Sequence, residues 1–253
     1  MSLLYVFAAT KTEADAVLRA ADGKARICGD GGLKAPIGPN EVLIATTGMG
    51  PRRARARAHD LLAKAQPEAV IVTGSCGSLT ETLDEDCVVT YTACLSADAT
   101  RSAPCSTVLA DAMIRRLQSE SLRCAPVVGV TTERIATTTQ EKLALARSGA
   151  SVVDMESYEV ISAATQRGIA SAVIRVVTDS LDRELPDFNR AVNPNGEVNP
   201  WAMLRIVVGS PILMAKLVGI NRRAMATLTR ALKTVLGADW TEPQPACEGG
   251  AGT

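Results

Sequence analysis

The chain has 253 residues, and its 27 Lys and Arg balance 27 Asp and Glu, so the formal net charge is zero. Hydrophobic residues make up 47% and charged residues 21%, which supplies a large core and excludes a wholly disordered chain. The balanced charge and an aromatic content of 3% argue against nucleic-acid binding by phosphate neutralisation or base stacking. The single histidine, His59, excludes a multi-histidine metal site.

Short β-branched segments alternate with alanine-rich helical segments along the chain. The expected strands, in chain order, are 3–9, 41–47, 69–73, 87–93, 127–132, a short strand around Val152, and 172–177. The expected helices are one that begins at Thr12, then 52–65, 106–119, 140–147, 157–167, and a helical region from Pro200 to about Leu236. This alternation is typical of an α/β fold built on one sheet. We expect one domain over 1–240 and a disordered tail over 241–253.

The sequence also carries signals about redox state and membranes. Its seven cysteines form no C-x-x-C pair, and the N-terminus lacks the basic segment of a signal peptide, so we expect reduced thiols in a cytoplasmic protein. The longest apolar stretch, 201–220, is interrupted by Arg205, Pro211 and Lys216, which argues against a membrane span. It is still more apolar than one helix face requires, so we expect it to contact a membrane surface, the sheet or another subunit.

Glycines and acidic residues follow the ends of several predicted strands. They are Glu13, the segment Gly48-Met49-Gly50, the segment 73–77, the pair Thr178-Asp179, and the segment 154–157 at a strand-to-helix junction. Because α/β enzymes bind ligands at the carboxyl ends of strands, we expect these segments to share one site. The sequence has neither the dinucleotide fingerprint G-x-G-x-x-G after its first strand nor a P-loop, which argues against the nucleotide cofactors that those motifs bind.

Three segments carry a more specific signal: VIVTGSCGSL over 70–79, VDMES over 153–157 and IRVVTD over 174–179. In order and spacing they resemble the nucleoside phosphorylase and nucleosidase superfamily, which includes the 5′-methylthioadenosine/S-adenosylhomocysteine nucleosidases. The segment 179–186 and the apolar stretch after it look more particularly like hopanoid-associated phosphorylases, which implies removal of adenine from adenosylhopane.

This resemblance implies a three-layer αβα sandwich with a central mixed, largely parallel sheet. It implies an enzyme that cleaves the N-glycosidic bond of a purine nucleoside, with the nucleoside as its small-molecule partner and no nucleic acid. Water or inorganic phosphate would be the co-substrate, with no metal and no cofactor. We also expect a homo-oligomer, a dimer or a trimer.

The resemblance assigns roles to individual residues. Asp179 matches the general acid that protonates the purine N7, and burial would keep its carboxyl protonated. Glu156 matches the carboxylate that holds the ribose hydroxyls, and Met155 would lie against the sugar. Glu13 matches the residue that positions the attacking water. The other expected site residues are Arg175 and Ser75 around that water, Ile135 over the base, Phe188 near the ribose, and Gly77 and Thr178 in the binding site.

Each of the three carboxylates also has an alternative explanation that is purely structural. Asp179 also fits a helix N-cap, Glu156 fits a helix cap or a structural partner of Arg175, and Glu13 fits the first turn of a helix.

The choice between water and phosphate depends on the segment after the first strand. The hexameric purine and uridine phosphorylases carry G-D-P-x-R there, whereas this chain has AATKTE over 8–13. The missing arginine and the presence of Glu13 favour water as the nucleophile. Lys11 keeps phosphorolysis open as the alternative. A second alternative is a non-catalytic nucleoside-binding protein, which would leave Asp179 and Glu156 without a task.

Overall fold

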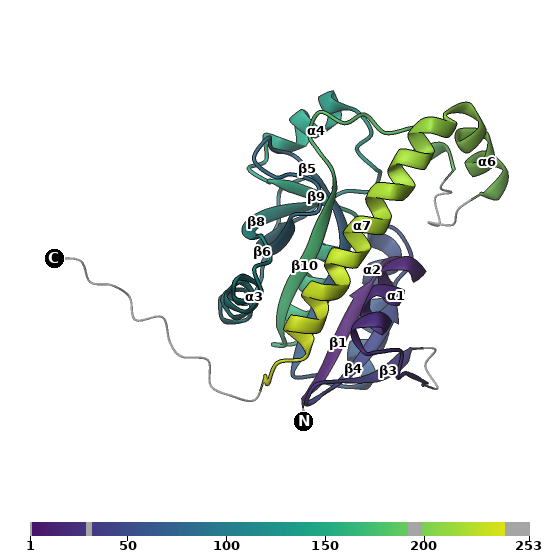
Figure 1. The fold of residues 1–253 in the computed structure, drawn as a ribbon. Coiled ribbons are helices and arrows are strands. Elements are labelled where there is room, and N and C mark those ends of the chain that lie inside the picture. The colour runs from purple at the N-terminus through teal and green to yellow at the C-terminus, as the bar shows by residue number, and fades with distance from the viewer. Residues whose placement is uncertain (1, 29–31, 192–198, 241–253) are drawn as a thin grey trace.

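The computed structural model describes residues 2–28, 32–191 and 199–240, so the expected tail at 241–253 lies outside it (Figure 1). The strands are β1 (Leu3–Ala8), β2 (Arg26–Ile27), β3 (Leu33–Ile37), β4 (Asn40–Thr46), β5 (Ala69–Ser78), β6 (Val88–Leu95), β7 (Ser102–Pro104), β8 (Cys124–Thr131), β9 (Val152–Asp154) and β10 (Ala170–Asp179). The helices are α1 (Lys11–Ala20), α2 (Pro51–Lys64), α3 (Thr107–Ser119), α4 (Thr139–Ala146), α5 (Ser157–Thr165), the 3₁₀ helix η1 (Phe188–Arg190), α6 (Pro200–Gly209) and α7 (Pro211–Leu236).

All of these strands belong to one mixed sheet. The order is β10-β6-β8-β9-β5-β1-β4-β3-β2, β7 pairs with β6, and β10 also pairs with β5. The ladders β1–β4, β1–β5, β5–β10, β6–β8 and β8–β9 are parallel. The ladders β6–β10 and β5–β9 are antiparallel. The predicted mixed sheet is confirmed, and the double pairing of β10 adds a feature that was not predicted: β5, β9, β8, β6 and β10 close into a ring.

Side chains alternate between the two faces of the sheet, as the period of a strand requires. In β1, Leu4 and Val6 join a buried cluster that includes side chains of α1, α3 and α7. Tyr5 and Phe7 join the opposite cluster, which includes side chains of α2 and α5. Figure 1 shows α1 and α7 in front of the sheet and α2 behind it. The predicted α/β sandwich, with helices on both faces, is confirmed.

Several elements differ from the sequence-based expectation. The first helix is capped by Thr10 rather than Thr12, because Thr10 and Glu13 form a reciprocal capping box. Strand β5 continues through the glycine segment to Ser78, because Gly77 pairs with both Asp179 and Val153. The short strands β2, β3 and β7 were not predicted; β2 and β7 are only two and three residues long, too short for a recognisable pattern.

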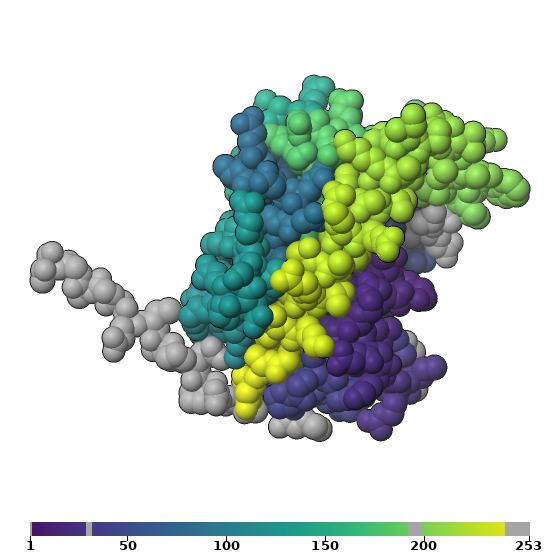
Figure 2. Space-filling view, viewed as in Figure 1, coloured from purple at the N-terminus to yellow at the C-terminus, as the bar shows by residue number. Residues whose placement is uncertain are grey.

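The apolar C-terminal region forms two helices rather than one. Helix α6 ends at Gly209, and Pro211 begins α7, because proline has no N–H to continue a helix but fits a first turn. The two axes differ by 109°. Helix α6 and the adjoining end of α7 form a projection at the upper right of Figure 2, while the rest of α7 lies across the body of the protein. Among the described helices, none is long and apolar enough to cross a membrane alone, and only this bent pair meets the length and composition test jointly.

Candidate active site

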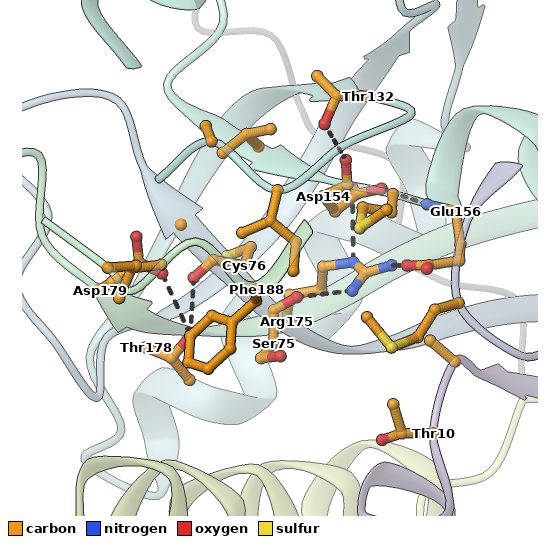
Figure 3. A pocket seen from close by; sticks show the side chains of 18 of the residues that line it. Thr10, Ser75, Cys76, Thr132, Asp154, Glu156, Arg175, Thr178, Asp179 and Phe188 are labelled. Atoms are coloured by element: carbon orange, nitrogen blue, oxygen red, sulfur yellow. Dashed lines mark hydrogen bonds and ion pairs between the residues drawn. The ribbon is translucent and has the colours of Figure 1, made fainter. Parts of the chain in front are cut away.

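A cavity of about 290 Å³ lies where β1, β5 and β10 end (Figure 3). Every site residue expected from the sequence lines it: Glu13, Ser75, Gly77, Ile135, Met155, Glu156, Arg175, Thr178, Asp179 and Phe188. These residues come from six separate stretches of chain, so only the fold brings them together. The polar groups divide into two sets, one around Arg175 and one around Asp179.

Glu13 is a buried carboxylate that lines the cavity and is surrounded by hydrogen-bond donors. Its Oε2 accepts from the backbone N of Thr10 at 2.9 Å and from the Thr10 hydroxyl at 3.0 Å. Its Oε1 accepts from the backbone N of Ser75 at 2.9 Å and from the Ser75 hydroxyl at 3.2 Å. The helix-terminus explanation of Glu13 is therefore confirmed, and the same side chain also joins α1 to β5. All four contacts are donors to the Glu13 carboxylate, two from Thr10 and two from Ser75.

Gly74 makes this approach of Glu13 to β5 feasible. Its φ of +148° lies in the region that favours glycine. A Cβ at this position would collide with Glu13 Oε1 and would lie 3.0 Å from Arg175 Nη1. The glycine of the TGSCG segment thus makes space for two charged side chains.

Arg175 is 1% exposed and lies at the centre of the first polar set. Its Nη1 donates to the carbonyl of Ser75 at 2.7 Å and its Nε to the Ser157 hydroxyl at 3.0 Å. Its Nη2 lies 3.4 Å from Glu156 Oε2, and its Nε lies 3.5 Å from Asp154 Oδ2. Although burial opposes the charge, the nearby carboxylates hold the pKa of Arg175 above its ordinary value, so it stays a cation.

Asp154 fixes the turn that presents Glu156. Its Oδ1 accepts from the backbone N of Glu156 and of Ser157, both at 2.8 Å, and from the Thr131 hydroxyl at 3.0 Å. Burial alone would raise the pKa of Asp154, but Arg175 and these donors hold it below the ordinary value. Asp154 therefore stays ionised and orients the turn. Asp154 belongs to the predicted segment 154–157, but this task was not predicted for it.

Glu156 occupies the N-cap position of α5, but its side chain lines the cavity and makes no capping hydrogen bond, so capping does not explain this side chain. Its Oε1 accepts from the backbone N of Gly50 at 2.9 Å, which ties the glycine loop after β4 to the site. Burial, together with the charges of Asp154 and Glu13, raises the pKa of Glu156 to about 7, against the opposing effect of Arg175. The ion pair with Arg175 that the sequence suggested is confirmed.

Asp179 is 8% exposed at the end of β10, and no helix begins there, so the N-cap explanation is wrong. Its Oδ2 lies 2.6 Å from Lys142 Nζ, and its Oδ1 lies 3.5 Å from the Thr178 hydroxyl. Gly77 leaves room for this carboxyl, because a Cβ there would lie 3.0 Å from Oδ2. Burial raises the pKa of Asp179, and Lys142 opposes that shift.

Lys142 is a residue beside the site that the sequence did not predict. Its side chain is fully buried behind Asp179, and its ammonium also donates to the carbonyls of Ser180 at 2.6 Å and Arg183 at 2.9 Å. The three N–H donors of the ammonium therefore each have an acceptor. No sequence signal marked it, because Lys142 is the sole buried residue of α4, while the apolar Leu143 and Leu145 of the same helix are not buried.

One side-chain amide joins two of the segments that line the cavity. The side chain of Asn189 accepts from the backbone N of Ile135 and donates to its carbonyl, both at 2.9 Å. The backbone N of Leu185 donates to Thr137 O at 2.8 Å. These bonds hold Phe188 and Ile135, two of the expected base- and sugar-contacting residues, at the same cavity.

Two further residues near the site, Lys11 and Cys76, have no chemical role in it. Lys11, considered as a phosphate ligand, has a side chain that is 87% exposed, binds Asp15 at 2.9 Å, and does not line the cavity. Cys76 does line the cavity, but burial raises the pKa of its thiol well above the ordinary range, which disfavours the nucleophilic thiolate.

A match to a known protein family shows to which family this chain belongs. The family model of the phosphorylase superfamily matches residues 31–205. The chain belongs to the phosphorylase superfamily. A search of the curated proteins finds no match.

Solved structures share this superfamily member's fold at low sequence identity. A mutant 5′-methylthioadenosine/S-adenosylhomocysteine nucleosidase of Helicobacter pylori with 5′-methylthioadenosine in the active site is 14% identical, with a TM-score of 0.74 over 93% of this chain and 98% of that chain. The Neisseria meningitidis nucleosidase in complex with methylthio-immucillin-A is 16% identical, with a TM-score of 0.74 over 94% and 99% of the two chains. Futalosine hydrolase of Helicobacter pylori is 14% identical, with a TM-score of 0.72 over 93% and 97%. Membership of this superfamily supports an enzyme that acts on the N-glycosidic bond of nucleosides.

Proposed function

We propose that this phosphorylase-superfamily protein hydrolyses the N-glycosidic bond of an adenine nucleoside. The observation that carries the proposal is the division of one cavity into two sets of groups. A buried carboxyl with a raised pKa, Asp179, lies on one side, and the carboxylates around Arg175 lie on the other (Figure 3). A nucleoside bound between the two sets would place its base near Asp179 and its ribose near Glu156.

The two sets of groups match the two halves of the reaction. As the bond between C1′ and the purine N9 breaks, its electron pair passes to the base, and Asp179 delivers a proton to N7. The water oxygen bonds to C1′, and Glu13, which the protein surrounds with donors, accepts the proton that the water loses. The contact from the Ser75 hydroxyl is the longest of the bonds to Glu13, at 3.2 Å, and is the one that a bound water would replace.

Ribose recognition would fall to Glu156 and Met155, which line the cavity beside each other. With Oε1 held by Gly50 and Oε2 near Arg175, Glu156 presents a fixed carboxyl whose remaining lone pairs can accept bonds from sugar hydroxyls.

The charge of the cavity supports water over phosphate as the nucleophile. Among the described residues that line it, Arg175 is the sole cation, and it is already engaged by Glu156 and Asp154. Glu13 would repel a phosphate dianion at the same place. Phosphorolysis stays the alternative, and it would need a cation from outside the described lining, because Lys11 faces solvent.

The finer substrate proposal is an adenine nucleoside with an apolar 5′ group, such as adenosylhopane. The resemblance to hopanoid-associated phosphorylases motivates it. Apolar side chains support it: Met49 and Phe188 line the cavity, and η1, which contains Phe188, contacts the apolar helix α6. Each CH₂ group buried there would contribute about 0.8 kcal/mol to binding.

The decisive experiment is adenine release from nucleosides with and without inorganic phosphate, with the sugar product analysed. Hydrolysis yields free sugar at a rate that does not depend on phosphate, whereas phosphorolysis requires phosphate and yields a sugar 1-phosphate. Asp179→Asn should lower turnover by about 10²–10⁴-fold, because the amide cannot transfer a proton. The matched control is Asp182→Asn, an exposed carboxylate three positions along the chain.

Three outcomes would contradict parts of the proposal. An absence of adenine release with bound nucleoside would indicate the non-catalytic alternative. Turnover of Asp179→Asn within about twofold of the wild type would remove Asp179 from the mechanism. Equal kcat/KM for methylthioadenosine and a long-chain 5′-alkyl adenosine would remove the apolar 5′ group from the substrate proposal.

A further inference from the structure

Exposed apolar side chains concentrate on the bent pair α6–α7. Over the described chain nine large apolar side chains are exposed, and six of them lie between Trp201 and Val218. Trp201 is 75% exposed, Val208 70% and Ile212 86%. No residue of α6 is buried. We call residues 200–222 the elbow.

The apolar residues of α6 share one face. Trp201, Leu204 and Val208 follow the i, i+3, i+7 spacing of a helix, and the exposed Arg205 lies among them. In α7 the most exposed apolar side chain, Ile212, is one turn from the exposed Lys216. A concentration of apolar side chains bordered by polar ones marks a contact surface.

The elbow and the rest of α7 carry positively charged side chains and no negatively charged ones. Residues 199–238 contain six Lys and Arg and no Asp or Glu. Arg223 pairs with Asp86 at 3.4 Å, and Lys233 pairs with Asp22 at 3.0 Å, on the body of the protein. The three exposed cations of the elbow, Arg205, Lys216 and Arg222, form no ion pair with any described residue. The surface that covers the elbow must therefore supply both apolar contact and negative charge.

A second copy of the elbow does not meet this requirement. In a two-fold symmetric contact the same patch faces itself, so the cations of one copy would face those of the other with no carboxylate between them. An anionic bilayer does meet it, because apolar side chains enter the boundary between headgroups and acyl chains while Arg and Lys reach the phosphates. We infer that the elbow docks the protein peripherally on an anionic lipid bilayer.

Docking at this place would bring the cavity to the membrane. Helix α6 contacts η1, and Phe188 of η1 lines the cavity. If the proposed function holds, a nucleoside with an apolar 5′ chain could enter from the lipid surface. The docking itself does not depend on that function.

The test is co-sedimentation of the full chain with vesicles of phosphatidylcholine alone or mixed with phosphatidylglycerol. We expect binding to the mixed vesicles and release by high salt. The triple variant Arg205→Gln, Lys216→Gln, Arg222→Gln should bind about a hundredfold more weakly, at about fivefold per cation. The triple variant Trp201→Ser, Val208→Ser, Ile212→Ser should lose at least about tenfold. The matched controls are Lys24→Gln with Lys64→Gln, and Ile27→Ser with Val108→Ser, which are exposed elsewhere.

A second readout follows the elbow directly. Trp201 and Trp240 are the two tryptophans, so Trp240→Phe leaves Trp201 as the sole indole. Its emission should shift to shorter wavelength on mixed vesicles but not on phosphatidylcholine. Any of four results overturns the inference: no binding to mixed vesicles, unchanged binding by both elbow variants, retention on vesicles in high salt, or a stable dimer that the elbow variants dissociate.

Adenine release from methylthioadenosine without vesicles separates the two proposals. Vesicle binding without adenine release refutes the proposed function and leaves the docking intact. Adenine release without vesicle binding does the opposite.

Discussion

Replacing Lys142 by Met removes the buried ammonium behind Asp179 and keeps a long side chain in the same space. In the wild type this ammonium gives one hydrogen bond each to Asp179 at 2.6 Å, Ser180 O at 2.6 Å and Arg183 O at 2.9 Å. The variant leaves all of these acceptors without their donor. Because the carboxyl is buried, no water shell replaces the lost cation.

The expected loss of stability is large and depends on pH. Removing one partner of a buried ion pair typically costs about 3–5 kcal/mol, because the remaining charge is uncompensated. Protonated Asp179 does not carry that charge, so the loss should be greatest above the pKa of Asp179 and shrink as the pH falls through it. The unfolding free energy of both proteins, measured in urea over a range of pH, gives this difference. Lys24→Met, at an exposed lysine, is the control.

The same substitution tests Asp179 as the proton donor. Without the nearby cation the pKa of Asp179 rises further, so its carboxyl keeps its proton to higher pH. The alkaline limb of the kcat profile for adenine release should therefore move to higher pH, even if turnover falls. A merely structural lysine would lower activity at every pH alike. An unmoved alkaline limb, together with a stability loss that does not vary with pH, would refute the role of Lys142 as the residue that positions and tunes Asp179.

Two further predictions concern the other half of the cavity. Burial raises the pKa of Glu156 from 4.5 to about 7, so between these two pH values the folded protein holds a proton that the unfolded chain has released. The free energy of unfolding should therefore fall by up to about 3 kcal/mol as the pH rises from 4.5 to about 7. Glu156→Gln should remove this pH dependence of stability in urea titrations. It should also lower the turnover of ribonucleosides more than that of their 2′,3′-dideoxy analogues. Equal losses on both substrates would show that the carboxylate does not hold the ribose. Gly74→Ala should lower the free energy of unfolding by about 1–3 kcal/mol more than Gly149→Ala does, and it should also reduce turnover. Both glycines have a positive φ, so the backbone strain is shared. A Cβ at Gly149 meets nothing within 4 Å, whereas a Cβ at Gly74 displaces Glu13. Similar stability and turnover for the two variants would show that Gly74 is not needed to make space for Glu13.

The sequence by itself determined the layered fold and which of the expected polar residues meet in one cavity. Short apolar strands between helices predict a sheet with helices on both faces, because each element needs a partner for its apolar side. The glycine and carboxylate segments after those strands were recognisable since parallel strands bring their carboxyl ends to one edge. Local motifs thus identified Glu13, Glu156 and Asp179 as neighbours before their positions were known.

Only the tertiary structure decided how these groups are charged and supported. Lys142 lies 37 residues before Asp179 in the chain, on a helix whose other residues are all at least partly exposed, so nothing local marks it as buried. The closed ring of strands arises from the double pairing of β10, which depends on contacts between distant segments. The bend at Pro211 was foreseeable as a break, but its 109° angle, and the exposure of the apolar face that it creates, depend on how α7 packs along the sheet while α6 does not. The pKa values and the exposed surfaces depend on burial and on contacts between distant segments, and a sequence pattern contains neither kind of information.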